Sequence, residues 1–182
     1  MFSQLPRRDF ERSKADNQDN ALEIMQRAGI DLLWKENDGG DKGVANKIHK
    51  IEVDRSQKNE LCNGRTCYDM ALLNNLDDQI ESMQGNRIVA MHLIGSHGPT
   101  YFQRYPKDKA FFQPDCPRAD IENCSVEQIV NSYDNTIRYT DFVLDKTIAK
   151  LKALEEKYNT ALIYVSDPVS YTHLRAHETP AN

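Results

Sequence analysis

The sequence lacks any apolar run long enough to cross a membrane. A transmembrane helix needs about 20 consecutive apolar residues, whereas the longest apolar runs here are Ile88–Ile94 and Ala161–Val165. The opening segment, MFSQLPRRDF, has no hydrophobic stretch of the kind found in signal peptides. Any export signal or membrane anchor is therefore expected to be encoded outside this sequence.

Concentrated positive charge is also missing. The 182 residues include 23 Lys and Arg against 28 Asp and Glu, with no block rich in lysine or arginine, so nucleic acid is not expected as a partner. Apolar residues make up 39% of the chain, which is enough to build a core and excludes global disorder. The length suits one domain of ordinary size.

Cysteine is scarce, and its spacing is informative. The four cysteines form two local pairs, Cys62 with Cys67 and Cys116 with Cys124, and neither pair has C-x-x-C spacing or a histidine close by. A zinc site at either pair is therefore disfavoured. Two small disulfide-closed loops in an oxidising compartment are the preferred interpretation, and four free thiols in the cytosol are the alternative.

Helical and strand patterns alternate along the chain. Helices are predicted at residues 20–28, 68–84 and from 126 onward, where Ser125 and Gln128 form a capping box. Strands are predicted at residues 30–34, 88–94 and 161–165, and residues 44–66 are expected to lie irregularly on the surface. This alternation predicts an α/β fold, a three-layer sandwich around a mostly parallel sheet.

Two groups of side chains are expected to pack. The last helix carries a long apolar stripe, namely Val126, Ile129, Val130, Tyr133, Ile137, Leu144, Ile148, Leu151 and Leu154. An aromatic cluster before that helix is expected to pack under a loop more than to form a ligand platform; it consists of Tyr101, Phe102, Tyr105, Phe111 and Phe112. Neither group is predicted to carry chemistry.

Candidate functional residues follow the predicted strands. Asp38 and Lys42 follow the first strand, His92 and His97 lie in and after the second, and Asp167 follows the third. The carboxyl ends of parallel strands share one edge of a sheet, where α/β active sites lie. Imidazole and carboxylate are zinc ligands, and lysine and histidine bind phosphate oxygens. The pattern favours a metal-assisted phosphoryl or sulfuryl site.

Each candidate also has a structural interpretation. His97 could stabilise a turn, and His92 could be a hydrogen-bonded core histidine. Asp167 could cap a helix, and Lys42 could be a solvated loop lysine. The pattern alone favours a functional role for His97 and Asp167. For His92 it favours neither the structural nor the functional role, and for Lys42 it favours a solvated loop position.

Several segments resemble one enzyme family, and they occur along the chain in the same order as in that family. They are MFSQLPRRDF, RAGIDLLWKENDGGDKG, LCNGRTCYDMALL, MHLIGSHGPTYFQRYP and VEQIVNSYDNTIRYTDFVLD. The sequence is similar here to the phosphoethanolamine–lipid A transferases, which include the mobile colistin-resistance enzymes. The resemblance covers residues 1–167, which it implies are a partial periplasmic catalytic domain. It implies the fold of alkaline phosphatase and the sulfatases.

The resemblance also implies an activity and a location. Such enzymes transfer phosphoethanolamine from phosphatidylethanolamine to lipid A, through a phosphothreonine at a zinc site. N-terminal transmembrane helices, which this chain lacks, anchor them so that the catalytic domain faces the periplasm at the inner membrane. Their product weakens binding of cationic polymyxins by lowering the negative charge of the outer surface.

The resemblance assigns roles residue by residue. Asp167 matches a zinc-ligand aspartate, while His97 and His92 match active-site histidines, the former also associated with substrate phosphate. Lys42 and Asp38 fall where the family contacts the phosphoethanolamine group. The pairs Cys62–Cys67 and Cys116–Cys124 match family disulfides. A further cysteine pair of some relatives is replaced here by Asp41 and Ala45.

Two departures from the family matter. The family's threonine nucleophile and an upstream glutamate ligand have no counterpart here. After Asp167 the family's SDHGES pattern is replaced by Pro168 and a tail, residues 168–182, with no resemblance, which is expected to be foreign or disordered. The fold is thus expected to be incomplete and the chain inactive by itself. Another enzyme of the superfamily, acting for example on the lipopolysaccharide core, or a non-catalytic remnant are the alternatives.

Overall fold

The structure is a computed structural model that describes residues 2–5 and 7–166, so Asp167 and the tail lie outside it. The chain consists of two compact units, and the division falls after Ile94. The helices and strands, in chain order, are η1 (Arg7–Asp9), α1 (Arg12–Asp16), α2 (Ala21–Arg27), β1 (Asp31–Glu36), β2 (His49–Glu52), η2 (Asp69–Leu73), α3 (Leu76–Ser82), β3 (Arg87–His92), η3 (Tyr101–Gln103), η4 (Lys107–Lys109), η5 (Ile121–Asn123) and α4 (Val126–Ala153).

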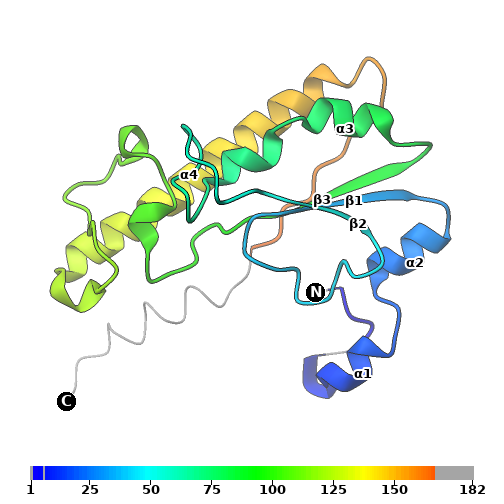
Figure 1. The fold of residues 1–182 in the computed structure, drawn as a ribbon, viewed down its shortest axis with the longest axis horizontal. Helices are drawn as coiled ribbons and strands as arrows, with labels where there is room; N and C mark the ends of the chain where they lie inside the picture. Colours follow the sequence, from blue (N-terminus) through cyan, green and yellow to red (C-terminus); the bar gives the residue numbers. More distant parts are fainter. Residues whose placement is uncertain (1, 6, 167–182) are drawn as a thin grey trace. The chain divides into compact units, whose positions relative to one another are not determined.

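A parallel three-stranded sheet forms the centre of the first unit (Figure 1). Its strand order is β2-β1-β3, and both neighbours run parallel to β1. The register places Glu36 opposite Glu52 on one side and opposite His92 on the other. All three strands therefore end at one edge, as the α/β prediction requires.

Helices cover both faces of this sheet. Leu22 of α2 packs with Leu32 and Trp34 on one face. On the other face Lys35 donates hydrogen bonds from its Nζ to the α3 residue Gln79 (Oε1, 2.5 Å) and to the carbonyl of Asn74 (2.8 Å). Because side chains alternate along a strand, β1 is buried on both sides, and the predicted three-layer arrangement is confirmed.

Local capping explains where α2 begins and ends. The Asn20 side chain accepts from the backbone N–H of Leu22 and Glu23, and Glu23 accepts from the Asn20 N–H, which completes a capping box. Gly29 follows the helix with a φ of +88°, a conformation that costs glycine little. The predicted helix at 20–28 and the strand that follows it are both confirmed.

The helix predicted over residues 68–84 is broken in two. Asn75 adopts the left-handed conformation, with a φ of +54°, between η2 and α3. Asparagine tolerates this region better than most residues, so the chain turns there while its apolar residues still face inward. Leu72, Leu76 and Ile80 are all buried, which is why the spacing resembled one continuous helix.

Two strand predictions were wrong in opposite ways. β2 lies inside the segment expected to be irregular, as an edge strand whose side chains are mostly exposed. The run at 161–165 forms no strand in the described part of the chain, and Ile163 is 88% exposed. A strand needs a neighbouring backbone to complete its hydrogen bonds, and none of the described residues provides one for this run.

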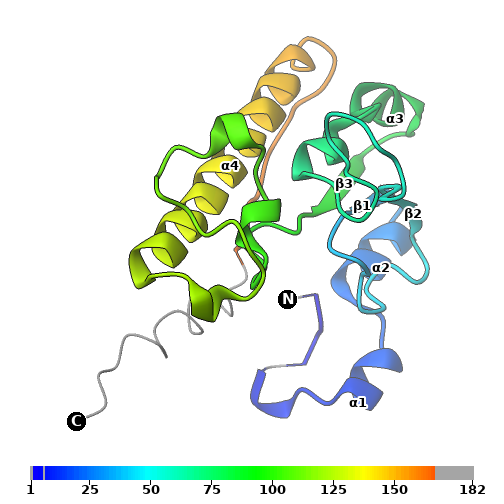
Figure 2. The ribbon, with the colours of Figure 1, turned by 60° about the vertical axis from the view of Figure 1, so that its left-hand side comes forward.

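The second unit is built on α4, with the preceding loops along it (Figure 2). The helix begins at the predicted capping box: Ser125 accepts from the N–H of Gln128, whose side chain accepts from the N–H of Ser125. Asn135 is fully buried and holds Phe112 at both its N–H (2.8 Å) and its carbonyl (2.9 Å). Ser132 likewise accepts from the N–H of Cys116.

The apolar stripe predicted for α4 does not describe its buried face. Val126, Ile137 and Ile148 are exposed. The buried residues are instead mostly small and polar, namely Ser132, Asn135, Thr136, Tyr139, Thr140, Val143 and Thr147. Some satisfy their own polarity locally, as when the Thr147 hydroxyl donates to the Val143 carbonyl at 2.8 Å. Hydrophobic spacing cannot reveal a face made in this way.

The aromatic cluster is only partly packed as predicted. Tyr101 and Tyr105 are buried, and the Tyr105 hydroxyl donates to Asp115 at 2.8 Å. Burial, together with the Asp115 carboxylate, raises the pKa of Tyr105 to about 12. Phe111, in contrast, is 63% exposed. The expectation that these rings simply pack under a loop is therefore wrong for Phe111.

Candidate active site

A buried carboxylate and a histidine meet where β1 and β3 end. Glu36 is 2% exposed, and its Oε2 lies 2.8 Å from Nδ1 of His92, the residue opposite it in the sheet. The same oxygen accepts the indole N–H of Trp34 at 2.9 Å, and Oε1 accepts the backbone N–H of Asp38 at 2.6 Å. The carboxylate is thus held from three directions.

These hydrogen bonds keep Glu36 ionised. Burial raises its pKa, but the bonds from Trp34, His92 and Asp38 outweigh burial and hold the pKa below the ordinary value. An ionised carboxylate can only accept, so Nδ1 of His92 must carry the proton of their shared hydrogen bond. The other ring nitrogen, Nε2, then carries the lone pair and faces Asp38.

Asp38 lies on the outer side of this histidine. Its Oδ2 is 3.7 Å from Nε2 of His92, which is too long for a direct hydrogen bond. The His92 side chain keeps 32% of its surface exposed and Asp38 keeps 19%. His92 is therefore both a hydrogen-bonded strand histidine and an accessible one, so the two interpretations of it are compatible.

A buried amide joins the ends of the two strands below this pair. Asn37 is 1% exposed and donates from Nδ2 to the carbonyl of Cys67 (3.1 Å) and to Oδ1 of Asp69 (2.7 Å). The same Asp69 oxygen accepts the backbone N–H of Ile94 at 2.9 Å. Asp69 therefore connects the residue after β1 to the segment after β3, which fixes the spacing of the residues around His92.

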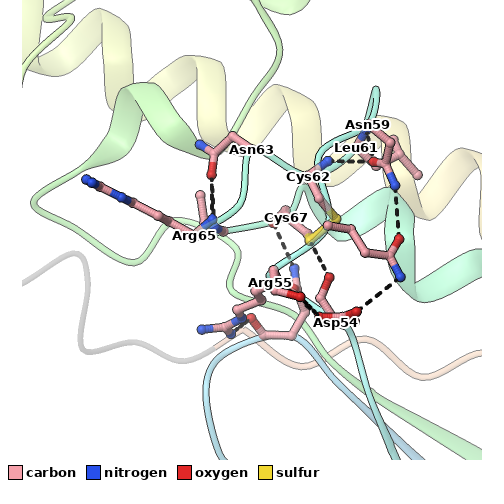
Figure 3. The surroundings of a disulfide bond; sticks show 12 residues. Asp54, Arg55, Asn59, Leu61, Cys62, Asn63, Arg65 and Cys67 are labelled. Carbon is pink, nitrogen blue, oxygen red and sulfur yellow. Dashed lines mark hydrogen bonds between the residues drawn. A yellow bond between two sulfur atoms is a disulfide. The ribbon is translucent and has the colours of Figure 1, made fainter.

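The first disulfide loop supports this arrangement. Cys62 is bonded to Cys67, and Cys67 lies beside the backbone of Asp54 (Figure 3). Arg55 extends from the same segment and donates to the carbonyl of Asn37. Cys116 is bonded to Cys124 in the second unit, and no free cysteine remains. Both predicted disulfides are therefore confirmed in the structure.

A cavity of about 360 Å³ opens at the ends of β1 and β2. It is lined by Glu36, Gly39, Glu52, Val53, Asp54 and Arg55. Its size falls in the range of small-molecule sites, roughly 300–1,000 Å³. The rule that sites lie beyond the carboxyl ends of parallel strands thus locates a real hollow in the first unit.

The loop after β1 carries Lys42 on an exposed, left-handed backbone with a φ of +53°. Beside it, Asp41 is buried and accepts the Ala45 N–H at 2.6 Å and the Lys50 Nζ at 3.1 Å. Burial alone would raise the pKa of Asp41. The hydrogen bonds from Ala45 and Lys50 outweigh burial and hold the pKa below the ordinary value. The hydrogen bond from the Ala45 N–H to Asp41 closes this loop.

His97 belongs to the second unit and is exposed. Its Nδ1 lies 2.9 Å from the Gly98 carbonyl, and its own carbonyl accepts from Nε of Arg104 at 2.9 Å. Ser96 is bonded to Thr136 of α4 through their hydroxyls at 2.7 Å. The turn that presents His97 is thus well anchored within its own unit.

The described residues do not form a metal site. No group of three or more His, Cys, Asp and Glu among residues 2–5 and 7–166 is arranged to hold an ion. The one residue expected to bind zinc, Asp167, lies outside that part of the chain. The pair of Glu36 and His92 is suited to accepting a proton at Nε2, from which the protonated ring can donate to an oxygen of a ligand.

Sequence patterns brought Asp38, Lys42 and His92 to one end of the sheet but missed Glu36 and Asp69. Glu36 was missed because the predicted strand, residues 30–34, stopped short of it, whereas β1 continues to Glu36. An acidic residue at the end of such a strand is itself a signal, because burying a carboxylate without partners is costly. Asp69 gives no comparable signal, since its partners are distant in sequence.

The chain is similar in sequence to several known proteins. A profile of the family described as Sulfatase matches residues 1–181. The phosphoethanolamine transferase EptA of Salmonella typhimurium is 42% identical over 167 residues, which cover 92% of this chain and 30% of that protein. Mcr-1 of Escherichia coli, named a phosphatidylethanolamine transferase, is 32% identical over 174 residues, covering 92% of this chain and 32% of that protein.

A solved structure shares the fold. The soluble domain of lipooligosaccharide phosphoethanolamine transferase A from Neisseria meningitidis is 41% identical, with a TM-score of 0.79 over 82% of this chain and 45% of that chain. The chain thus spans about a third of the curated relatives' length. No helix within residues 2–5 and 7–166 is long and apolar enough to cross a membrane. The parallel α/β fold and the profile match together show that this chain belongs to the sulfatase family.

Proposed function

We propose that this chain forms part of the catalytic domain of an enzyme that transfers phosphoethanolamine from phosphatidylethanolamine to lipid A. The similarity to EptA, continuous over 92% of the chain, carries the proposal. The arrangement of Glu36, His92 and Asp38 at the strand ends supports it, because phosphoryl transfer depends mainly on positioned charge and hydrogen bonds. The enzyme would act at the periplasmic face of the inner membrane.

The described side chains take defined roles in this proposal. His92, oriented by Glu36, keeps a lone pair on Nε2 that can take a proton from an attacking hydroxyl, and the protonated ring then donates from Nε2 to a phosphate oxygen. Lys42 adds a positive charge from the adjacent loop, and Asp38 binds the ammonium group of ethanolamine. His97 binds a phosphate oxygen from its own turn. Each role rests on chemistry and position, with His92 the best supported by contacts.

The proposed enzyme uses zinc, and residues other than the described ones would supply most of its ligands. Asp167 is assigned as one ligand, and the described residues do not complete a site. Bound zinc would polarise the phosphorus centre and activate a hydroxyl nucleophile. Titration of the purified chain with zinc is therefore expected to show weak binding, and the chain alone is expected to transfer no phosphoethanolamine.

A chimera tests the proposed function. Residues 1–166 of this chain replace the matching segment of the Salmonella typhimurium EptA, and lipid A from cells carrying the chimera is analysed by mass spectrometry. The expected result is lipid A that carries phosphoethanolamine. A chimera that is inserted in the membrane and folded, yet leaves lipid A unmodified, would contradict the proposal.

Substitutions in that chimera test the assigned roles. His92→Gln and Lys42→Gln are expected to lower the modified fraction of lipid A by at least tenfold. Lys152→Gln, an exposed position near the end of α4, serves as the matched control and is expected to change nothing. Equal loss in all three variants would indicate a general folding defect instead of a role in the site.

A further inference from the structure

A second cavity, of about 470 Å³, lies entirely within the second unit. We call it the η4–α4 pocket, and it is lined by Asp108, Lys109, Ala110, Phe111, Arg138, Tyr139 and Phe142. The wall combines three aromatic rings with two cations and one carboxylate. Its volume is that of a small-molecule site, and no residue of it takes part in the site at the strand ends.

Arg138 is the most telling residue of this pocket. Its guanidinium carbon lies 3.8 Å from the centroid of the Phe111 ring. No described carboxylate lies within salt-bridge distance of it, and no hydrogen bond engages its N–H groups in the described chain. A guanidinium stacked on a ring keeps its edge donors available, and that planar fork matches phosphate oxygens.

The aromatic rings offer a complementary surface. Phe111 is 63% exposed, so its ring is open to a ligand. Tyr139 and Phe142 stack with centroids 6.0 Å apart and planes 23° apart. The negative face of an aromatic ring attracts the weakly positive C–H face of a sugar, so the exposed Phe111 and the partly exposed Phe142 suit a saccharide, while Tyr139 is buried behind them.

Two lysines lie near the ring of Phe142. Lys109 Nζ lies 4.8 Å and Lys146 Nζ 5.0 Å from the centroid of that ring. Each lysine also has an acidic neighbour, Asp108 at 3.4 Å and Asp145 at 3.1 Å. Arg138 is therefore the one cation of the pocket without a described carboxylate partner. One unpaired guanidinium is suited to binding one phosphate group.

We infer that the η4–α4 pocket binds a phosphorylated saccharide, with the phosphate on Arg138 and the sugar against the rings of Phe111 and Phe142. A nucleotide would also offer a ring and a phosphate. The choice of saccharide rests on the proposed function, whose acceptor is a phosphorylated glycolipid. In that enzyme the pocket would hold part of the acceptor, apart from the strand-end site that handles the phosphoethanolamine.

Binding to the intact 182-residue chain tests the inference by calorimetry. Glucosamine 6-phosphate is the probe, compared with glucosamine, inorganic phosphate and adenosine monophosphate. The expected order places glucosamine 6-phosphate at least tenfold tighter than the other three. Inorganic phosphate or glucosamine binding equally well, or the nucleotide binding tighter, would overturn the inference.

Variants locate the binding. Arg138→Gln is expected to weaken glucosamine 6-phosphate at least tenfold, and Arg138→Lys to weaken it less, because lysine keeps the charge but loses the fork. Phe111→Ser is expected to weaken it several-fold, and Lys152→Gln not at all. Unchanged binding in Arg138→Gln and Phe111→Ser would refute the pocket. Because no transfer step is measured, failure here leaves the proposed function intact, and failure of the chimera leaves this binding intact.

Discussion

The two units use buried polar side chains in different ways. In the first unit, Glu36 is hydrogen-bonded to His92, and Asp69 is hydrogen-bonded both to Asn37 and to the backbone of Ile94. These bonds hold the strand ends that carry His92 and Asp38 in place. In the second, Ser132 and Asn135 bind the backbone of a preceding loop. Buried polar side chains thus position the candidate site residues in the first unit and hold a loop in the second.

This difference predicts where each unit is vulnerable. Loss of a polar group in the first unit should disturb the strand-end site before it disturbs the fold. Loss of one in the second should release a length of loop that has little other regular structure. Stability and local spectroscopy therefore respond differently to matched substitutions in the two units.

The largest effect is expected from Asn135→Ala. The side chain satisfies both the N–H and the carbonyl of Phe112, and its removal leaves two partly buried backbone groups without this partner. A loss of about 3 kcal/mol in the free energy of unfolding is expected. Urea denaturation followed by circular dichroism measures it. Asn131→Ala, which removes one hydrogen bond from the same helix to the Pro114 carbonyl, is the matched control with an expected loss of about 1 kcal/mol.

Replacing the disulfides compares the two units directly. Cys62→Ser with Cys67→Ser, and Cys116→Ser with Cys124→Ser, are each expected to cost about 2–3 kcal/mol, because both close short loops. Only the first pair should also shift the ¹H–¹⁵N signal of the Asn37 side-chain amide, which donates to the Cys67 carbonyl. An equal shift from both pairs would contradict the separation of roles.

Glu36→Gln is expected to cost about 2 kcal/mol, because the charge that three donors satisfy is lost. Trp34, the only tryptophan, donates its indole N–H to that carboxylate. In the unsubstituted chain the indole ¹H–¹⁵N signal should therefore titrate with a midpoint below the ordinary glutamate pKa, because the pKa of Glu36 is lowered. A midpoint above that value would refute the account, and Glu36→Gln should abolish the titration.

How far the sequence could predict this molecule differs between the same two units. Alternating helix and strand signals predicted β1, β3 and the edge at which Asp38 and His92 lie close together, because parallel strands leave few alternatives. The face of α4 could not be predicted, because Ser132 and Thr136 are buried through hydrogen bonds that no hydrophobic period records. Phe111 was misjudged for a related reason: whether a ring packs or stays exposed depends on contacts distant in sequence.

Asp41→Asn is expected to have the smallest effect, about 1 kcal/mol, since the Ala45 N–H can still bind the amide oxygen while the pairing with Lys50 loses its charge. The pKa of Asp41 is lowered in the folded chain, so its contribution is complete above the unfolded pKa and is lost as the pH falls through the folded value. Unfolding followed at pH 7 and near pH 3 measures this. The difference between the parent and Asp41→Asn should shrink at the lower pH, and a difference that grew on acidification would show that Asp41 is not held as a carboxylate in the loop after β1.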